Sequence, residues 1–212
     1  MAHEHAPTLT LPVGSHDHSE GPADAPVTLV EYGDYECPHC GMAYPIVKEV
    51  QRRLGKQLRF VFRNFPIPDN HPHAIHAAEA AEAAGAQDRF WPMHDLLYEH
   101  QRKLNDRHLV EYAHALGLDD DQFQRELADH VHIPRVREDV ASGVESGVRG
   151  TPTFFINGMR IVGSRPESEF IATIDREMAN ARTLLERGTA RGAIYEAISA
   201  QAATEAVYVE ER

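Results

Sequence analysis

The chain is poor in cysteine, in positive charge and in long apolar runs. Two of its 212 residues are cysteine, too few for a fold held together by disulfides. Its 21 lysines and arginines face 33 aspartates and glutamates, a net charge of −12, which argues against nucleic acid or an anionic membrane surface as a partner. No apolar run approaches the roughly 20 residues of a membrane-spanning helix. What remains can bury a core in one domain, or in one domain with an insertion.

The N-terminus lacks the features of a secretory signal. Residues 1–7 contain neither a basic stretch nor an apolar one, and a signal peptide has both. We therefore expect a cytoplasmic protein, or a periplasmic or other extracytoplasmic one whose leader has been removed. Residues 1–23 form a polar arm that contains His3, His5, His16 and His18. We expect this arm to be solvated, with a weak metal-binding tail as the alternative, and the alternation Leu9-Thr10-Leu11 is compatible with an added edge strand.

The two cysteines lie where a strand meets a helix. Residues 27–34 begin with an apolar, β-branched run that is typical of a buried parallel strand. Residues 41–54 carry apolar side chains at helical spacing and stop before a glycine. Cys37 is therefore predicted at a helix N-terminus, with Cys40 one turn inside. Unpaired amides and the helix dipole stabilise a thiolate there, so we expect the pKa of Cys37 to lie well below about 8.5, the value of a free thiol.

Three neighbours bear on this cysteine pair. Pro38 fits the first helical turn, because its missing N–H would have no partner there. His39 can add positive charge or a hydrogen bond near the sulfur. Glu31 is a carboxylate in an otherwise apolar strand. Either it faces water at the strand end, or it is buried beneath Cys40 and moves protons. The residues alone leave both interpretations open.

A redox site is the favoured interpretation of the pair, since C-x-x-C beside a β-α pattern is typical of one. A structural zinc site needs four ligands, and the chain has no second cysteine pair. His73 and His76 have the spacing of one helix face, but no carboxylate or cysteine obviously completes a site. We therefore expect no metal and no cofactor.

The remaining pattern describes an α/β frame interrupted by helices. Residues 57–65 alternate in polarity and should form a strand parallel to the first, joined to it by a right-handed crossover through the helix between them. Helices are then predicted over 73–84, 88–101, 106–117, 119–132 and 134–147. A strand within 150–158, an Asn157-Gly158 hairpin turn, a strand over 159–162 and a helix over 166–186 follow. The expected domains are 24–68 with 148–186 as the frame, 69–147 as an all-α insertion, and 187–212 as a tail in which Ile194-Tyr195 can dock.

Pro152 opens the strand after the insertion. An X–Pro bond is the one peptide bond in which the cis form costs little, roughly 0.5–1 kcal/mol. A cis bond here would turn the backbone of Thr151 outward, ready to pair with an extended peptide. A trans proline at a strand start is the alternative, which the residues slightly favour.

Several segments together resemble the DsbA-like branch of the thioredoxin superfamily. Cys37-Pro38-His39-Cys40 matches the active-site tetrapeptide of that branch. Similar segments are Leu29-Val30-Glu31-Tyr32, His71-Pro72-His73-Ala74, Phe90-Trp91, Met93-His94-Asp95-Leu96-Leu97 and Gly150-Thr151-Pro152-Thr153-Phe154. The resemblance covers residues 24–185. It implies a thioredoxin fold with an inserted all-α helical domain, a cis Pro152 that faces the cysteine pair, and a buried carboxylate at Glu31.

The expected function is thiol-disulfide exchange with protein or peptide thiols and disulfides. The expected catalytic residues are Cys37, Cys40, His39, Pro38 and Glu31, and the expected substrate-binding residues are Thr151 and Pro152. A redox-recycling partner of unknown identity is implied; nucleic acid and membrane insertion are not. The direction, oxidase or reductase, stays open, because secreted relatives carry leaders and the residue before the proline varies in the superfamily. A peptide-binding chaperone-like module and a glutathione-linked transferase or isomerase are the alternatives.

Overall fold

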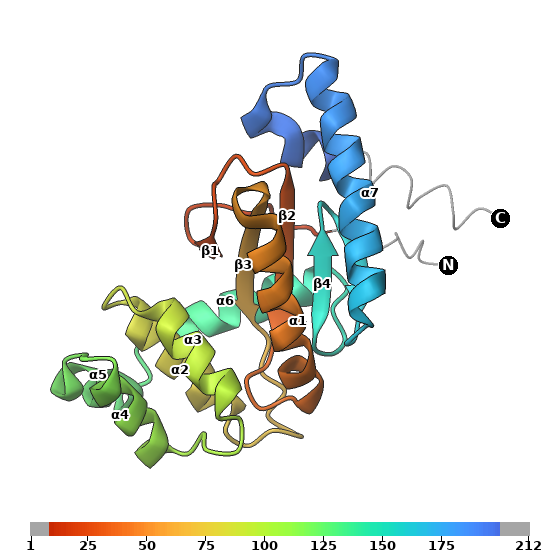
Figure 1. The fold of residues 1–212 in the computed structure, drawn as a ribbon. Coiled ribbons are helices and arrows are strands. Elements are labelled where there is room, and N and C mark those ends of the chain that lie inside the picture. The colour runs from red at the N-terminus through yellow and green to blue at the C-terminus, as the bar shows by residue number, and fades with distance from the viewer. Residues whose placement is uncertain (1–8, 200–212) are drawn as a thin grey trace.

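The computed structural model of the protein describes residues 9–199. Within them the strands are β1 (His18–Glu20), β2 (Val27–Gly33), β3 (Leu58–Asn64), β4 (Thr153–Ile156) and β5 (Met159–Val162). The α-helices are α1 (Pro38–Leu54), α2 (Ala74–Gly85), α3 (Phe90–Glu99), α4 (Asp106–Ala115), α5 (Asp120–Ala128), α6 (Ile133–Glu145) and α7 (Glu167–Glu186), with short 3₁₀ turns at Gly55–Gln57 and Arg191–Ala193. Figure 1 shows α2 to α5 gathered at one side of the sheet.

The sheet has the order β1-β3-β2-β4-β5. Strands β2 and β3 are parallel and are connected through α1, while β4 runs antiparallel to β2 and β5 antiparallel to β4. The predicted β-α-β unit and the C-terminal hairpin are therefore confirmed. The hairpin turn has φ of 46° at Asn157 and 91° at Gly158, which are the positive values that a type I′ turn requires.

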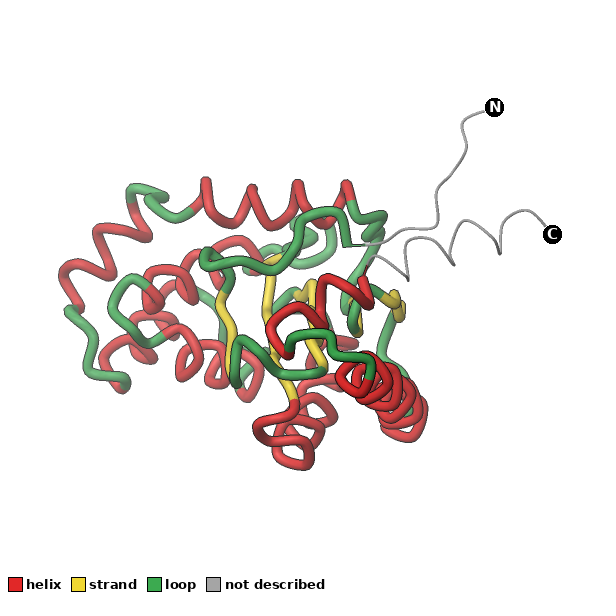
Figure 2. The backbone as a smooth tube through the Cα atoms, turned by 90° about the horizontal axis from the view of Figure 1, so that it is seen from above, coloured by secondary structure: helices red, strands yellow, loops and turns green. Residues whose placement is uncertain are grey.

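The sheet has helices on both faces (Figure 2). Because side chains alternate along a strand, Leu29 of β2 and Phe60 of β3 belong to a core that includes residues of α1, α2, α3 and α7. Val30, Tyr32 and Val61 point to the other face, where Val140 of α6 packs. Glu31 is two residues from Leu29 on the same strand, so its side chain points to the same face of the sheet. This is the face that α1 covers and where the cysteines lie.

The five helices predicted between the two halves are confirmed, with two differences in detail. Helix α5 ends at Ala128, short of the predicted residue 132, and the N-cap of α4 is Asn105, whose side chain accepts a hydrogen bond from the His108 amide. Helix α6 also packs directly on the sheet: the hydroxyls of Ser142 and Tyr32 lie 2.9 Å apart. Gly143 permits this approach, because a Cβ there would lie 2.8 Å from the Phe65 ring.

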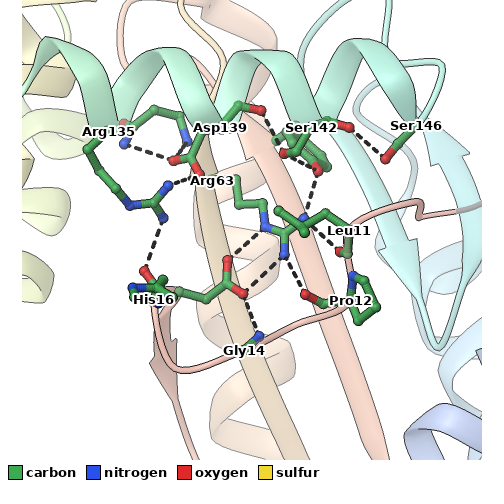
Figure 3. Close-up of polar contacts among 12 residues, drawn as sticks. Leu11, Pro12, Gly14, His16, Arg63, Arg135, Asp139, Ser142 and Ser146 are labelled. Atoms are coloured by element: carbon green, nitrogen blue, oxygen red, sulfur yellow. Dashed lines mark hydrogen bonds and ion pairs between the residues drawn. The ribbon is translucent and has the colours of Figure 1, made fainter.

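The N-terminal segment differs from its prediction. Its strand is His18–Glu20, paired with β3, while residues 9–11 form no strand. Most residues of its described part are exposed, as expected, but the segment is also anchored to the sheet, because Arg63 of β3 is fully buried and a buried guanidinium needs partners. Arg63 donates to the Asp17 carboxylate at 2.7 Å and to the carbonyls of Leu11 and Pro12 (Figure 3). His3 and His5 lie outside the described residues.

Beyond α7, the predicted docking of Ile194-Tyr195 is confirmed. Ile194 is buried against Ala181 of α7, and the guanidinium carbon of Arg59 lies 5.3 Å from the centre of the Tyr195 ring. Among residues 9–199, none of the helices is both long enough and apolar enough to cross a membrane.

Candidate active site

The cysteine pair lies at the carboxyl end of β2, as predicted. Cys37 is the N-cap of α1 and Pro38 occupies its first turn. The Cys37 amide donates to the Asp34 carbonyl, and the Cys37 carbonyl accepts from Gly41, both at 3.1 Å. Cys37 is 5% exposed and Cys40 is fully buried. Both carry free thiols, so the structure describes the reduced protein.

The turn between β2 and α1 is organised by Asp34, a residue that the sequence analysis did not single out. Its buried carboxylate accepts from the Glu36 amide at 2.8 Å and from the Ile67 amide at 2.9 Å, and lies 2.7 Å from Nδ1 of His71. Its own amide donates to Sγ of Cys40 at 3.5 Å. The available signal was an aspartate two residues before Glu36 in a turn, a position from which the side chain can bond the following backbone.

Gln101 is a second residue that sequence reasoning missed. It follows α3, yet its side-chain amide donates to the carbonyls of Tyr35 at 2.7 Å and Cys37 at 3.0 Å. The helical insertion thereby supports the backbone on which Cys37 sits. No local sequence pattern predicts this contact, because Gln101 and Cys37 are 64 residues apart in the chain.

The environment of Cys37 stabilises its thiolate. The pKa of Cys37 is lowered to about 5, first by a hydrogen bond from the Cys40 thiol, and further by contact with Thr151 and by the backbone N–H groups of Cys40 and His39. Burial acts in the opposite direction. The expected low pKa is thus reproduced, with the second cysteine as its largest cause. Near neutral pH, Cys37 is a thiolate.

Cys40 and Glu31 behave in the opposite way. Burial raises the pKa of Cys40 well above that of a free thiol. Burial, followed by repulsion from the Cys37 thiolate, raises the pKa of Glu31 to about 8. Glu31 is 2% exposed, and its Oε1 has no hydrogen-bond partner within residues 9–199. The structure therefore selects the buried interpretation of Glu31 over the solvent-facing one, and its carboxyl group is protonated at neutral pH.

The segment before β4 closes the other side of the site. The Thr151–Pro152 peptide bond is cis, as the resemblance implies, and the trans alternative that the residues alone slightly favoured is wrong. Sγ of Cys37 lies 3.4 Å from the carbonyl oxygen of Thr151. The hydroxyl of Thr151 is buried and makes no hydrogen bond within the described residues. Segments more than 110 residues apart in the chain thus meet at one sulfur.

Two expectations for histidines have different outcomes. His39 is exposed and acts on Cys37 through its backbone N–H, so a role for its ring stays a prediction. His73 does not pair with His76: its Nδ1 lies 2.8 Å from Glu36, and its amide donates to the same carboxylate.

A reactive cysteine at a helix N-terminus, a buried partner cysteine and a facing cis-proline define the redox class of thioredoxin-fold proteins. The sequence model of the family described as Thioredoxin matches residues 15–176. The chain therefore belongs to the thioredoxin family, and its fold, with the helical insertion, is that of the DsbA-like thiol-disulfide oxidoreductases.

Solved structures agree with this assignment. A thioredoxin-like oxidoreductase from Silicibacter pomeroyi is 28% identical with a TM-score of 0.69, over 77% of this chain and 92% of that one. BdbD from Bacillus subtilis is 25% identical with a TM-score of 0.72, over 77% of this chain and 94% of that one. Wolbachia pipientis α-DsbA1, at 20% identity and a TM-score of 0.72, shares the fold over 84% of this chain and 98% of that one.

Curated relatives with higher identity are much longer proteins. The Na(+)/H(+) antiporter NhaA 1 of Salinispora arenicola is 48% identical over 175 residues, which are 82% of this chain and 27% of the relative. The Na(+)/H(+) antiporter NhaA 3 of Salinispora tropica is 46% identical over 181 residues, 85% of this chain and 28% of the relative. The chain thus spans little more than a quarter of the length of these relatives.

Proposed function

We propose that the chain catalyses thiol-disulfide exchange and works as an oxidant of protein thiols. The observation that carries this proposal is the position of Cys37, held between the first amides of α1 and the Cys40 thiol, with a pKa of about 5. Such an environment stabilises the reduced form, because only the reduced form contains the thiolate. A disulfide between Cys37 and Cys40 is correspondingly easy to reduce.

In the proposed reaction a substrate thiolate attacks Sγ of Cys37 in the disulfide form. The Cys37–Cys40 bond breaks, a mixed disulfide forms on Cys37, and Cys40 leaves as a thiolate. Because the pKa of Cys40 lies well above neutral, that thiolate takes up a proton, and the protonated Glu31 beneath it is the proposed donor. The second substrate thiolate then attacks the substrate sulfur of the mixed disulfide and releases Cys37 as a stable thiolate. Two electrons have passed to the cysteine pair, and a partner disulfide must remove them.

Extended protein thiols are the proposed substrates. The backbone carbonyl of Thr151 lies beside the attacked sulfur, which supports a role for this backbone in pairing with an incoming chain. Backbone pairing is tolerant of side-chain identity, which suits a catalyst with many protein substrates. The likeness to the oxidoreductase from Silicibacter pomeroyi also supports this class of reaction.

The electrostatics of Cys37 set the expected size of the effect. A pKa of about 5 lies two units below pH 7, which at 1.36 kcal/mol per unit stabilises the reduced form by roughly 3 kcal/mol. For a two-electron couple, about 30 mV corresponds to 1.4 kcal/mol. The Cys37 environment alone therefore raises the reduction potential by about 60 mV.

The deciding experiment is equilibration of the Cys37–Cys40 pair with glutathione. We expect a potential of about −210 mV, which is the −270 mV of a thioredoxin-type reductase raised by the 60 mV that the Cys37 environment contributes. A value near −270 mV would reverse the proposed direction. Full activity in Cys37→Ser would instead favour the peptide-binding chaperone-like module, and full activity on glutathione conjugates in Cys40→Ala the glutathione-linked enzyme.

A further inference from the structure

A second group of metal-ligating side chains lies in the helical insertion, apart from the thiol site. His76 and Glu79 come from α2, and His130 comes from the turn after α5. One potential ligand atom from each lies within 4.8 Å of the other two. His76, Glu79 and His130 have no role in the thiol-disulfide exchange proposed above, so the exchange reaction does not explain why they lie together.

We propose that His76, Glu79 and His130 bind one divalent transition-metal ion, Zn²⁺ by the chemistry of the ligands. Two imidazoles and one carboxylate form a ligand set that zinc uses, with a fourth position left for water. Bonds of roughly 2.0–2.1 Å in a tetrahedron place two ligand atoms about 3.3–3.4 Å apart. Nδ1 of His130 lies 3.3 Å from Oε1 and 3.0 Å from Oε2 of Glu79, so this pair already has nearly that separation.

The burial of Glu79 supports a cation at this position. Glu79 is 1% exposed, and a carboxylate out of water needs positive charge or several donors close by. His130 reaches it from the solvent side, with about half of its side chain exposed. A Zn²⁺ ion between the two would supply the charge that a neutral imidazole lacks.

Asp106 of α4 orients the third ligand. Its Oδ1 lies 2.8 Å from Nδ1 of His76, which leaves Nε2 as the ring nitrogen available to an ion. Metal-binding histidines commonly donate their other ring N–H to a carboxylate, which fixes the tautomer and the ring orientation. The ring centroids of His76 and His130 lie 5.5 Å apart, with the ring planes tilted by 51°.

The proposed site has room for an ion and is open to solvent. A hollow of about 300 Å³ adjoins the cluster, lined by His76, Asp106, Val110, Gln124, Leu127, Ala128 and His130. It gives room for a water on the fourth position and a route for the ion from solvent. An ion held there would tie α2 to the turn after α5, and through Asp106 to α4, so its expected effect is on the stability of the insertion.

Sequence reasoning missed this site because it paired His76 with the wrong neighbour. The i, i+3 relation that matters joins His76 to Glu79, whereas His73 lies against Glu36. The remaining ligand, His130, is 51 residues beyond Glu79. The expectation that the chain has no metal site is replaced by this proposal.

The test is Zn²⁺ titration of chelator-treated full-length protein in its disulfide form, so that the cysteines do not compete, against a chromophoric chelator. We expect one bound equivalent, lost in His130→Ala and in Glu79→Gln, and weakened roughly 10–100-fold in Asp106→Asn. His114→Ala is the matched control, because it removes an exposed histidine that pairs with Asp120 in the same insertion. A variant with His3, His5 and His16 changed to alanine controls for the arm. Both controls should keep the site.

Two measurements on the unaltered protein cover the case in which a ligand variant fails to fold. Co²⁺ should give the visible absorption of a tetrahedral site, and Zn²⁺ should shift the imidazole nitrogen resonances of His76 and His130 but not that of His114. One equivalent of Zn²⁺ retained in both His76→Ala and His130→Ala, or no binding and no shift in the unaltered protein, would overturn the proposal.

Discussion

Cys37 and Cys40 are separated by two residues and have opposite acidities. Cys37 lies at the open end of α1, where backbone amides, the Cys40 thiol and the Thr151 carbonyl surround its sulfur. Cys40 is buried one turn further in, on the same side of the sheet as Glu31, and its pKa is raised. The pair therefore has one sulfur suited to accept and release a substrate and another that must exchange a proton whenever it reacts.

The first prediction concerns the acidity of Cys37. In reduced protein, thiolate absorbance should appear with a midpoint near pH 5, and Cys37→Ser should abolish this transition. In Cys40→Ala the midpoint should rise by about one unit, because a hydrogen bond to a charged group contributes roughly 1.5 kcal/mol. It should still lie below the free-thiol value of about 8.5, since the helix amides remain. An apparent pKa of 8 or above in the unaltered protein would show that the N-terminus of α1 and the Cys40 thiol do not stabilise the Cys37 thiolate.

The second prediction concerns Glu31 and the dependence of stability on pH. Its pKa is about 8 in the folded protein against 4.5 for the ordinary carboxyl, so between these values the folded state holds a proton that the unfolded state has lost. The stability that Glu31 contributes is thus complete below pH 4.5 and falls as the pH rises towards 8. Glu31→Gln removes this loss. The difference in free energy of unfolding between Glu31→Gln and the unaltered protein should therefore shift by roughly 3 kcal/mol in favour of the variant when the pH is raised from 5 to 7.

Urea denaturation of both proteins under reducing conditions measures this gain, with the exposed Glu145→Gln as matched control. If the difference between Glu31→Gln and the unaltered protein does not change with pH, Glu31 is not the buried carboxylic acid described here. The same variant should slow disulfide exchange, because Gln cannot pass a proton to Cys40.

Helix α6 and the N-terminal segment both cover the face of the sheet opposite α1. Helix α6 packs against Tyr32 and Phe65 through Gly143. The segment over residues 9–17 follows the same face, and Arg63 reaches it from β3 (Figure 3). This face supports β2, and β2 carries Glu31 and leads to Cys37.

The third prediction tests the ion pair between Arg63 and Asp17. Arg63→Met should cost about 3–5 kcal/mol of unfolding free energy, because it leaves the Asp17 carboxylate buried without its partner. The double variant Arg63→Met/Asp17→Leu should recover a large part of this loss, since removing both charges removes the unpaired one. Arg107→Met, which breaks an exposed ion pair with Glu111, is the control and should leave stability unchanged. Equal losses in the single and double variants would argue against a buried ion pair.

At the scale of the whole molecule, the frame and the insertion share one core. The largest apolar cluster contains Leu29 and Phe60 of the sheet together with Phe90 and Leu97 of α3. Trp91 contacts Phe60 of β3, with ring centroids 5.5 Å apart. Gln101 adds a polar link to the cysteine turn. The insertion is therefore not an independent lobe, and loss of its packing would reach the active site directly.

The fourth prediction follows from this shared core. Urea unfolding monitored by the fluorescence of Trp91, the sole tryptophan, should coincide in midpoint with unfolding monitored by far-UV circular dichroism, as one cooperative transition requires. The reactivity of the otherwise buried Cys40 thiol should report the same midpoint. Two separated transitions, with Trp91 changing first, would indicate that the insertion unfolds alone.

Local sequence patterns predicted much of this architecture. Hydrophobic periodicity located the strands, the helices and the hairpin turn, because each pattern reflects burial on one face of a local element. The position of Cys37 at a helix end followed from the same periodicity. The prediction missed the strand at His18–Glu20 and the anchoring of the N-terminal segment, because composition does not reveal that the buried Arg63 of β3 needs partners. Local patterns also left Glu31 undecided, because burial depends on what packs above a strand; the resemblance to the DsbA-like branch implied the burial that the structure shows.

The sequence by itself determined the chemistry of this protein: two cysteines at the end of a strand, a helix after them to lower one pKa, and a proline that begins a distant strand. These follow from backbone geometry within a few residues. Tertiary structure alone decided that Thr151 faces Cys37, that Asp34 and Gln101 support the cysteine turn, that Glu31 is buried and protonated, and that His130 reaches Glu79. Each of these depends on contacts between residues far apart in the chain, and only the packing of the folded core brings such residues together.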